Sequence, residues 1–248
     1  MALSLSARGV RHAFGRVAAL EDVSLDVAAG KAVALVGESG SGKTTLLRCF
    51  NRTVTPHEGT VLVDGVDVRD AEPVSLRRRL GYVPQHGGLL PHWTVAQNVG
   101  FVLRALRQPH RDAVADALDL VGLPLAGYGE RFPRELSGGQ RQRVALARAL
   151  AAAPGAILLD EPFGALDAIT RAEVQDAFDG VRRRLNVTAL LVTHDLGEAA
   201  RMADEIVVMR AGRVEQRGPM GALRSAPASD YVRELVQRAL RAAEGLSA

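Results

Sequence analysis

The sequence predicts an α/β protein with an antiparallel β layer near its N-terminus and a block of helices inserted into a parallel-sheet core. Three observations support this class. The apolar run Ala32–Val36 leads through a glycine-rich segment, 37–44, into a helical pattern that ends at Asn51. From Ala156 onward, strand-like and helix-like segments alternate, as they do in parallel sheets. Between these parts, about residues 88–150 have the apolar spacing of helices and no strand pattern.

The first third of the chain is rich in predicted strands. Residues 17–27 include an alternating stretch, and residues 60–68 hold Asp64-Gly65 between valine-rich runs. Asp-Gly between strand formers is a strong hairpin signal. Residues 80–84 form a further short predicted strand that ends at Gln85. We therefore expect an antiparallel layer beside a parallel one.

The remaining elements follow from periodicity and from turn residues. Helical patterns cover residues 43–51, 95–106, 111–121, 141–152, 168–185, 196–202 and 231–244, the last as an exposed terminal helix. Further strands are expected at 156–159, 189–192 and 206–209, with a last strand or turn at 212–217. The predicted organisation is one domain over residues 1–235, with the helical block inserted, and a helical tail over 236–248.

Composition narrows the functional classes. The 248 residues are 47% hydrophobic and 24% charged, which is typical of a globular protein. A formal net charge of +3 is too small to indicate a nucleic-acid partner. The arginine clusters at 77–79 and 182–184 are interpreted as solvated faces. Cys49 is the only cysteine, so no intrachain disulfide is possible, and we expect a buried structural thiol.

The apolar runs of the sequence are short. The N-terminus lacks the pattern of a signal peptide, and no apolar run approaches the roughly 18 to 20 residues that span a bilayer. We therefore expect a cytoplasmic location, with any link to a membrane made through a partner.

The segment 37–44 has the order of a phosphate-binding loop: strand, glycine-rich turn, helix. Glycines let successive N–H groups point inward, and the helix N-terminus adds partial positive charge. Lys43 is expected to reach the β- and γ-phosphates of a nucleotide, and the Thr44 hydroxyl to bind Mg²⁺. The alternative, a Gly/Ser turn before a core helix, does not explain the matching flanks.

Polar residues follow three predicted strands at the edge where α/β sheets bind ligands. Asp160 is placed to hold Mg²⁺, and Glu161 to act as general base toward a water that attacks the γ-phosphate. His194 is expected to contact the γ-phosphate and that water, although a structural histidine is an alternative. Gln85 is expected to bond a metal-bound water, although a simple loop glutamine is an alternative.

A second glycine-rich segment, 136–140, precedes an alanine- and arginine-rich helix. Ser137, Gly138 and Gly139 place small residues with N–H groups at a helix start, which is a second anion site. The alternative is a serine cap with glycines in the first turn, but paired glycines weaken a helix, so capping alone explains them poorly. Two phosphate sites about a hundred residues apart suggest two surfaces that meet on one nucleotide.

Together these motifs resemble those of the ATP-binding subunits of ATP-binding-cassette (ABC) transporters, in the family's order and over nearly the whole chain. Walker A matches Gly37, Glu38, Ser39, Gly40, Ser41, Gly42, Lys43 and Thr44; the Q-loop matches Gln85; the signature matches Leu136, Ser137, Gly138, Gly139 and Gln140; Walker B matches 157–161; the D-loop matches Gly164, Ala165, Leu166 and Asp167; the switch histidine matches His194.

The resemblance implies a fold, ligands and partners. The fold is a P-loop NTPase (RecA-like) core with the N-terminal antiparallel β subdomain and the inserted α-helical subdomain. The ligands are ATP and Mg²⁺, with Thr44, Gln85 and Asp160 as the metal set and Lys43, Gln85, Glu161 and His194 as the catalytic set. The other implied nucleotide contacts are the rest of Walker A, the signature residues, and Thr45, Asp160, Asp167 and Phe14. The resemblance places the Phe14 ring against adenine; the alternative for Phe14 is a position in the core.

Two such subunits are implied to face head to tail, as a homodimer or paired with a similar ATPase subunit. Each signature loop then closes on the ATP held by the other subunit's P-loop. Transmembrane permease subunits and, indirectly, an extracytoplasmic solute-binding protein are the other implied partners. The implied location is the inner face of the plasma membrane, peripheral through the permease.

The finer resemblance is to importers of quaternary amines such as glycine betaine, choline and carnitine. It rests on the stretch 82–92, from Tyr82 to His92, and less strongly on 161–171, which nitrate, sulfonate and taurine importers share in part. ATPases of those importers, or a soluble ABC ATPase of cofactor assembly, are the alternatives. Leu89, Leu90, Pro91 and Trp93 are expected either to line the groove that receives a permease helix or to form subdomain core.

Overall fold

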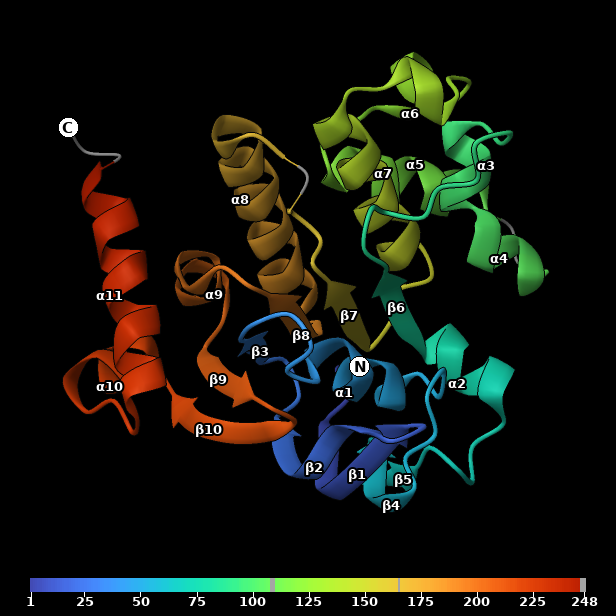
Figure 1. Cartoon of the computed structure of the whole chain (residues 1–248). Helices are drawn as coiled ribbons and strands as arrows, with labels where there is room; N and C mark the ends of the chain where they lie inside the picture. Colours follow the sequence, from blue (N-terminus) through green and yellow to red (C-terminus); the bar gives the residue numbers. More distant parts are fainter. Residues whose placement is uncertain (108–109, 165, 246–248) are drawn as a thin grey trace. The chain divides into compact units, whose positions relative to one another are not determined.

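The computed structural model describes residues 1–107, 110–164 and 166–245 of the chain. The chain divides into two compact units (Figure 1). One contains residues 74–188 together with the first two residues, and the other contains residues 3–73 and 189–248. They are called here the inserted unit and the P-loop unit.

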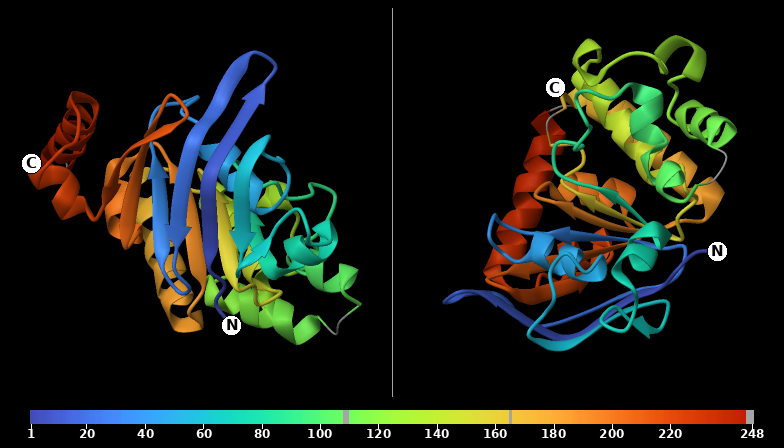
Figure 2. Two further views of the ribbon diagram at one scale, coloured as in Figure 1. Left: turned by 90° about the horizontal axis from the view of Figure 1, so that it is seen from below. Right: turned by 90° about the vertical axis from the view of Figure 1, so that its right-hand side faces the viewer.

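The P-loop unit begins with a four-stranded antiparallel sheet in the order β2-β1-β4-β5. Its strands are β1 (Leu5–Phe14), β2 (Val17–Val27), β4 (Glu58–Val63) and β5 (Val66–Asp67). Figure 2 shows β1 and β2 as long neighbouring strands, and Leu5 pairs with Val27. Asp64 and Gly65 have φ angles of 55° and 77°, the positive values that a two-residue hairpin turn needs. The predicted hairpin is confirmed.

The second sheet region of this unit surrounds β3 (Ala32–Val36), a strand that is buried along its whole length. Parallel strands β8 (Thr188–Thr193) and β9 (Glu205–Arg210) flank β3, and β10 (Arg213–Gly218) pairs antiparallel with β9. Val36 is in register with Thr193 on one side and with Val208 on the other. The loops that follow β3, β8 and β9 therefore leave from one edge, where ligands bind in such sheets.

The helices of the P-loop unit are α1 (Lys43–Phe50), α9 (Leu196–Met202), α10 (Met220–Ser225) and α11 (Asp230–Gly245). Figure 1 shows α11 as the last helix of this unit. Val232 and Val236 of α11 are buried. The prediction of an exposed terminal helix is therefore wrong for one face of α11. Buried aliphatic side chains four positions apart fix that face to its own unit.

The inserted unit contains two parallel strands, β6 (Leu80–Val83) and β7 (Ala156–Asp160), with Leu80 opposite Ala156. Its helices are α2 (Pro73–Arg79), α3 (Val95–Val99), α4 (Phe101–Ala105), α5 (Arg111–Leu120), α6 (Leu125–Tyr128), a 3₁₀ turn (Pro133–Glu135), α7 (Gly138–Leu150) and α8 (Ala168–Leu185). The middle of α7 is apolar and buried, so this helix is the core element around which the others pack.

Two predicted helices have different bounds in the structure. The helix expected over 95–106 is two short helices separated at Gly100, where glycine's low helix propensity favours a break. A Cβ at Gly100 would also lie 3.3 Å from Val114 Cγ2 of α5, so a larger residue would crowd that helix. The helix expected to start at Arg141 starts at Gly138, because Ser137 caps it there.

Within the described ranges, no helix combines the length and the apolar character that crossing a bilayer requires. The buried Cys49 on α1 matches the expected structural thiol, and burial raises its pKa to about 12.

Candidate functional site

The glycine-rich loop after β3 depends on glycine at positions where a side chain has no room. Gly40 and Gly42 have φ angles of 79° and 99°, in the region that L-residues avoid. A Cβ at Gly42 would lie 2.3 Å from the carbonyl oxygen of Ala19, and one at Gly37 would lie 2.1 Å from that of Met209. At Gly40, by contrast, no described atom lies within 4 Å of such a Cβ. The loop therefore packs against other backbone at Gly37 and Gly42, whereas Gly40 has free space around it.

Lys43 carries its charge inside this loop. Its Nζ donates hydrogen bonds to the carbonyl oxygens of Gly37 and Glu38, both at 2.7 Å, and to Ser41 Oγ at 3.2 Å. The residue is only 5% exposed. Because Lys43 is also the first residue of α1, its ammonium group and the partial positive charge of the helix N-terminus lie in one loop. A strand, a glycine loop with a buried lysine and a helix together fit a nucleotide's phosphates.

The remaining Walker A residues lie around this lysine. Ser41 is buried, Thr44 and Thr45 are half-buried in the first turn of α1, and Glu38 and Ser39 are exposed. Hydroxyl groups on the first turn of the helix are in the right element to bind a metal ion or phosphate oxygens.

His194 lies beside the start of this loop. A cavity of about 350 Å³ is lined by Gly37, Glu38 and His194, by Asp195 and Leu196, and by residues of α11. Asp195 accepts hydrogen bonds from the amides of Gly197 and Glu198, which caps α9 and fixes the turn that carries His194. The structure thus brings the predicted switch histidine and the P-loop to one cavity.

Phe14 lies at the end of β1 and is 56% exposed, which rules out the core alternative. Its ring contacts His12 edge-on, with centroids 4.6 Å apart. An exposed aromatic ring at a strand end is available for stacking on a base, and its role against adenine stays a prediction.

In the inserted unit, Asp160 and Glu161 end β7 as expected. Asp160 is 2% exposed, whereas Glu161 is half-buried and has a φ of 46°. A positive φ at a residue other than glycine is uncommon and is often found at functional positions. Gln85 Nε2 donates a hydrogen bond to Glu161 Oε2 at 3.1 Å. The predicted Q-loop amide and the predicted base are therefore direct partners.

Arg148 is a site-supporting residue that sequence reasoning missed. Its guanidinium donates to the carbonyl oxygens of Gly87 at 2.6 Å and Gly88 at 2.7 Å, directly after Gln85. His86, Gly87 and Gly88 all have positive φ, so this turn needs external support. Burial lowers the pKa of Arg148 below its usual value. The glycine pair signalled the turn, but nothing in the sequence paired it with an arginine sixty residues later.

The second glycine-rich loop is a capped helix start. Ser137 Oγ accepts from the Gln140 amide at 3.2 Å, and Gln140 Oε1 accepts from the Ser137 amide at 3.0 Å, which is a reciprocal capping box. Gly139 is buried against Thr170, where a Cβ would lie 2.2 Å from Thr170 Cγ2. Gly138 is exposed, and a Cβ there would make only ordinary contacts, with Leu166 Cδ2 at 3.8 Å and a guanidinium nitrogen of Arg141 at 4.0 Å. Packing thus explains Gly139 but not Gly138.

Asp167, at the end of the predicted D-loop, caps α8. Its carboxylate accepts from the Thr170 amide at 3.0 Å, and this backbone hydrogen bond lowers the pKa of Asp167. Ala165 of the same motif lies outside the described residues. The D-loop and the signature loop are neighbours, because Leu166 and Thr170 border the two signature glycines.

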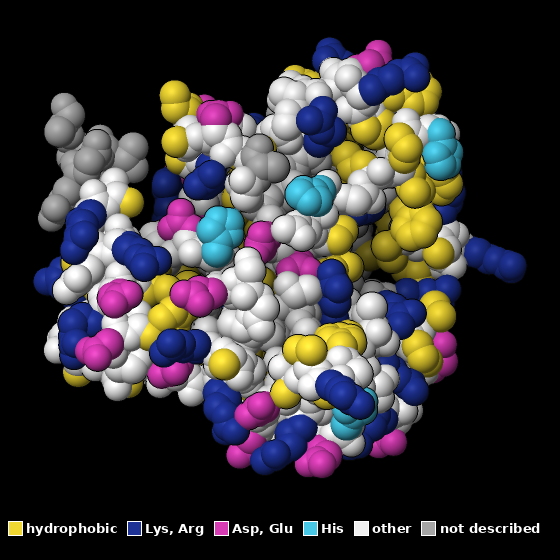
Figure 3. Space-filling model, viewed as in Figure 1, with side chains coloured by type: hydrophobic (Ala, Val, Ile, Leu, Met, Phe, Trp, Pro, Cys, Tyr) yellow, Lys and Arg dark blue, Asp and Glu magenta, His cyan; other side chains and the backbone are white. Residues whose placement is uncertain are grey.

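Of the two alternatives for Leu89, Leu90, Pro91 and Trp93, the structure excludes subdomain core for Trp93, and the permease groove stays a prediction. Trp93 is half-buried, and its ring contacts Phe101 at 5.8 Å between centroids and Arg104 at 4.9 Å, so it is not core. A separate cavity of about 290 Å³ in the same unit is bordered by Tyr82, Phe101 and other residues of β6, α4 and α7. The described residues that line it do not include Leu89, Leu90, Pro91 or Trp93. Figure 3 shows hydrophobic side chains gathered over α3 and α4.

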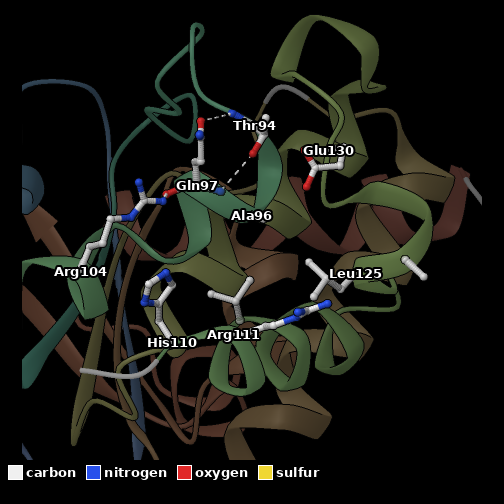
Figure 4. A pocket seen from close by; sticks show the side chains of 10 residues that line it. Thr94, Ala96, Gln97, Arg104, His110, Arg111, Leu125 and Glu130 are labelled. Atoms are coloured by element: carbon white, nitrogen blue, oxygen red, sulfur yellow. Dashed lines mark hydrogen bonds between the residues drawn. The ribbon is translucent and has the colours of Figure 1, made fainter. Parts of the chain in front are cut away.

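A larger cavity of about 720 Å³ lies among α3, α5 and α6 (Figure 4). Arg104, His110, Arg111 and Glu130 are the charged or titratable residues described at its wall. The predicted nucleotide contacts are not among the described residues that line it.

The fold and the loop around Lys43 define a P-loop nucleotide-binding protein. Residues 20–164 match the ABC transporter family, and the chain belongs to that family.

Curated proteins that are similar to this chain include ATP-binding proteins of several importers. The glycine betaine/carnitine/choline transport ATP-binding protein OpuCA of Bacillus subtilis (strain 168) is 43% identical over 220 residues, which are 88% of this chain and 58% of the relative. The glycine betaine uptake system ATP-binding protein YehX of Escherichia coli (strain K12) is 43% identical over 233 residues, 92% and 75% of the two chains. The sulfate/thiosulfate import protein CysA of Synechocystis sp. (strain ATCC 27184 / PCC 6803 / Kazusa) is 44% identical over 234 residues, 93% and 64%. The chain thus spans 58% of the length of OpuCA.

A solved structure agrees with the fold. The dimeric post-hydrolysis structure of the ATP-binding cassette MJ0796 bound to ADP and Pi matches with a TM-score of 0.77 and 30% identity, covering 87% of this chain and 98% of that chain. This likeness confirms the predicted P-loop NTPase core with an antiparallel β part and a helical part.

Proposed function

We propose that this protein is the ATP-hydrolysing subunit that powers an ABC importer. The observation that carries the proposal is the buried Lys43 ammonium, held by three oxygens inside a glycine loop at the start of a helix. Such a fixed cation stabilises negative charge as it grows on transferring phosphoryl oxygens.

In this proposal, ATP binds through the loop of Gly37 to Thr45, and Phe14 stacks on its adenine. Thr44, Asp160 and Gln85 would hold Mg²⁺ through their side-chain oxygens, the type of ligand that this ion prefers. Mg²⁺, when bound, neutralises charge on the phosphates. The burial of Asp160 suits this role, because a buried carboxylate is stable when a cation or hydrogen bonds compensate its charge.

The proposed chemical step is hydrolysis of the terminal phosphoryl bond. Glu161 accepts a proton from a water molecule as the water oxygen forms a bond to the γ-phosphorus. The bond from the γ-phosphorus to the oxygen it shares with the β-phosphate breaks, and its electron pair remains on ADP. Gln85 orients the Glu161 carboxylate through the 3.1 Å hydrogen bond, and His194 contacts the γ-phosphate.

The partners follow from the exposed signature loop. A second cassette, identical or similar, provides Ser137, Gly138, Gly139 and Gln140 to the ATP held by this chain, and Asp167 lies at the same contact. MJ0796, the solved relative, is dimeric. Permease subunits dock on the inserted unit at the cavity bordered by Tyr82 and Phe101, which keeps this chain on the inner face of the plasma membrane, and a solute-binding protein acts from outside.

For the solute, we propose quaternary amines such as glycine betaine, choline or carnitine. OpuCA and YehX, whose names state these amines or glycine betaine, support this class. Sulfate is the second candidate, because the sulfate/thiosulfate relative is equally similar at 44% identity. ATPase stimulation in a reconstituted complex with its permease and binding protein tests both. Stimulation by betaine or choline supports the first class, and stimulation by sulfate alone contradicts it.

The Glu161→Gln variant tests the catalytic proposal. It keeps the shape of the side chain and removes the base, so we expect ATP binding to persist while hydrolysis falls at least about 100-fold. The protein should then accumulate as an ATP-bound dimer, which size-exclusion chromatography detects. Glu58→Gln, at the exposed first residue of β4, is the control and should hydrolyse ATP normally. Near-normal ATPase activity of Glu161→Gln would exclude this residue as the base.

A further inference from the structure

The peptide bond between Gly37 and Glu38 is held at both ends. Its carbonyl, that of Gly37, accepts from Lys43 Nζ at 2.7 Å. Its amide, that of Glu38, donates to the Tyr231 hydroxyl at 3.1 Å. A peptide group is planar and rotates as one body, so a bond at its amide also fixes the direction of its carbonyl. The bond to Tyr231 therefore acts on the oxygen that holds Lys43.

Tyr231 comes from α11, far from the P-loop in sequence but within the same compact unit. Its own position is fixed. Val232, the next residue, is buried, and the Arg210 guanidinium lies 4.9 Å from the centre of the Tyr231 ring. This is within the range of a cation–π contact. Burial raises the pKa of Tyr231, so the hydroxyl stays protonated at neutral pH.

Strand β9 connects the two supports of the loop. The carbonyl oxygen of Met209 occupies the space that a Cβ at Gly37 would need, at 2.1 Å. Arg210, the next residue, holds the ring of Tyr231. The first two residues of the loop are therefore supported from the end of β9, once through backbone packing and once through Tyr231.

We infer that Tyr231 is a positioning residue of the P-loop, through which α11 fixes the Gly37–Glu38 peptide and hence Lys43. The inference rests on the proposed function, because it takes Lys43 to bind the phosphates of ATP. The last described helix of the chain thus contributes to nucleotide affinity without contacting the nucleotide.

The Tyr231→Phe variant removes only the hydroxyl. Without this acceptor the Gly37–Glu38 peptide can rotate, and Lys43 loses part of its hold on the loop. One neutral hydrogen bond corresponds to about a 3- to 10-fold change in affinity. We expect the Kd for ATP to rise by this factor, and kcat to fall by no more than the same factor, because Lys43 also stabilises negative charge on the transferring phosphoryl group. Ser225→Ala, which removes an exposed hydroxyl at the end of α10 in the same unit, is the control and should leave the Kd unchanged.

A double-mutant cycle tests the path through Arg210. Arg210→Ala releases the ring of Tyr231 and should raise the Kd in the same direction by a smaller factor. When combined with Tyr231→Phe it should add little, because both changes act on one contact. Fully additive effects of the two substitutions would overturn the inference.

Amide hydrogen exchange of Glu38, measured without nucleotide, separates this inference from the proposed function. We expect the exchange of this amide to accelerate at least about 3-fold in Tyr231→Phe, with the melting temperature unchanged. If the wild-type protein binds no ATP, the proposed function fails, and the exchange rate still tests the contact. If the wild-type protein binds ATP and Tyr231→Phe binds it equally well, the inference is wrong.

Discussion

The two glycine-rich loops use glycine for different physical reasons. In the P-loop, Gly42 has a φ of 99° and no space for a Cβ, and helix α1 begins there without a side-chain cap. In the signature loop, the glycines have no positive φ, and a serine caps the helix. The fold of this chain requires Gly42, whereas nothing within the described residues requires Gly138.

This difference indicates what each loop contacts. A loop whose glycines are needed for its own backbone conformation is already shaped before a ligand binds. Contacts within this chain therefore explain why those positions are glycine. An exposed glycine that the fold does not require lies where another molecule's close approach would select it. Substitution at the two loops should therefore separate the effect on the free energy of unfolding from the effect on ATPase activity.

Gly42→Ala should have the largest effect on stability. The new Cβ would meet the Ala19 carbonyl at 2.3 Å in a backbone conformation that alanine avoids. We expect the free energy of unfolding to fall by about 2 to 4 kcal/mol, with ATP binding lost. Gly65→Ala, at φ 77° but with no described atom within 4 Å of a Cβ, is the control for backbone strain alone. Urea denaturation measures both, and equal losses would show that the clash at Gly42 contributes nothing.

Ser137→Ala should have a smaller effect. It removes the hydroxyl that caps α7 at the Gln140 amide and leaves the helix otherwise intact. We expect a loss of about 1 kcal/mol in the free energy of unfolding. ATPase activity should fall more than this loss explains, because the same hydroxyl is proposed to contact the second subunit's ATP. Asp195→Ala removes the cap of α9 and gives a reference value for the loss in free energy of unfolding that a missing cap causes. A loss of stability with unchanged activity would limit Ser137 to capping.

Gly138→Ala should change stability least. Alanine fits there with only ordinary contacts, at 3.8 Å and 4.0 Å, and has a higher helix propensity than glycine. We expect the free energy of unfolding to stay the same or to rise by up to about 1 kcal/mol. ATPase activity should nevertheless fall about 10-fold or more, because a methyl group displaces the second subunit's phosphate. Gly180→Ala, at an exposed position of α8 where a Cβ meets no described atom within 4 Å, is the control and should gain stability without losing activity. Full ATPase activity of Gly138→Ala would contradict the claim that Gly138 is glycine because another molecule approaches it closely.

The reactivity of a thiol on α1, compared with that of a thiol in the P-loop, tests whether α1 is fixed while the loop is accessible. Burial raises the pKa of Cys49 to about 12, so at pH 8 almost no thiolate is present. We expect Cys49 to react with a thiol reagent at least about 100-fold more slowly than a cysteine placed at the exposed Ser39 in a Cys49→Ala background. Comparable rates would show that α1 opens readily.

Much of the fold was predictable because local patterns and tertiary packing agree. The hairpin at Asp64-Gly65, the strand before the P-loop and the βαβ alternation after Ala156 are all found. The sequence does not identify strand β1, because its in/out alternation breaks at Gly9, which has a φ of 57° and lies where the pairing register with β2 shifts. Helices α2, α6 and α10 were also missed, because runs of four to seven residues carry too little periodicity.

In the candidate site, the motifs were predictable and the contacts among them were not. Sequence spacing located Lys43, Gln85 and Glu161. It could not show that Lys43 bonds its own loop or that Gln85 donates to Glu161 across 76 positions. Arg148 and Tyr231 belong to no motif, since their partners are backbone groups whose positions depend on the tertiary fold.

A crystal structure of the Glu161→Gln variant with ATP and Mg²⁺ tests the central claim most directly, that two glycine loops from separate polypeptides hold one triphosphate. The account predicts Lys43 of one copy and the Ser137–Gln140 loop of another within about 3 Å of the same phosphate oxygens, the distance of a charge-assisted hydrogen bond. If residues 136–140 lie far from every bound polyphosphate, in their own copy and in every neighbour, the account is contradicted.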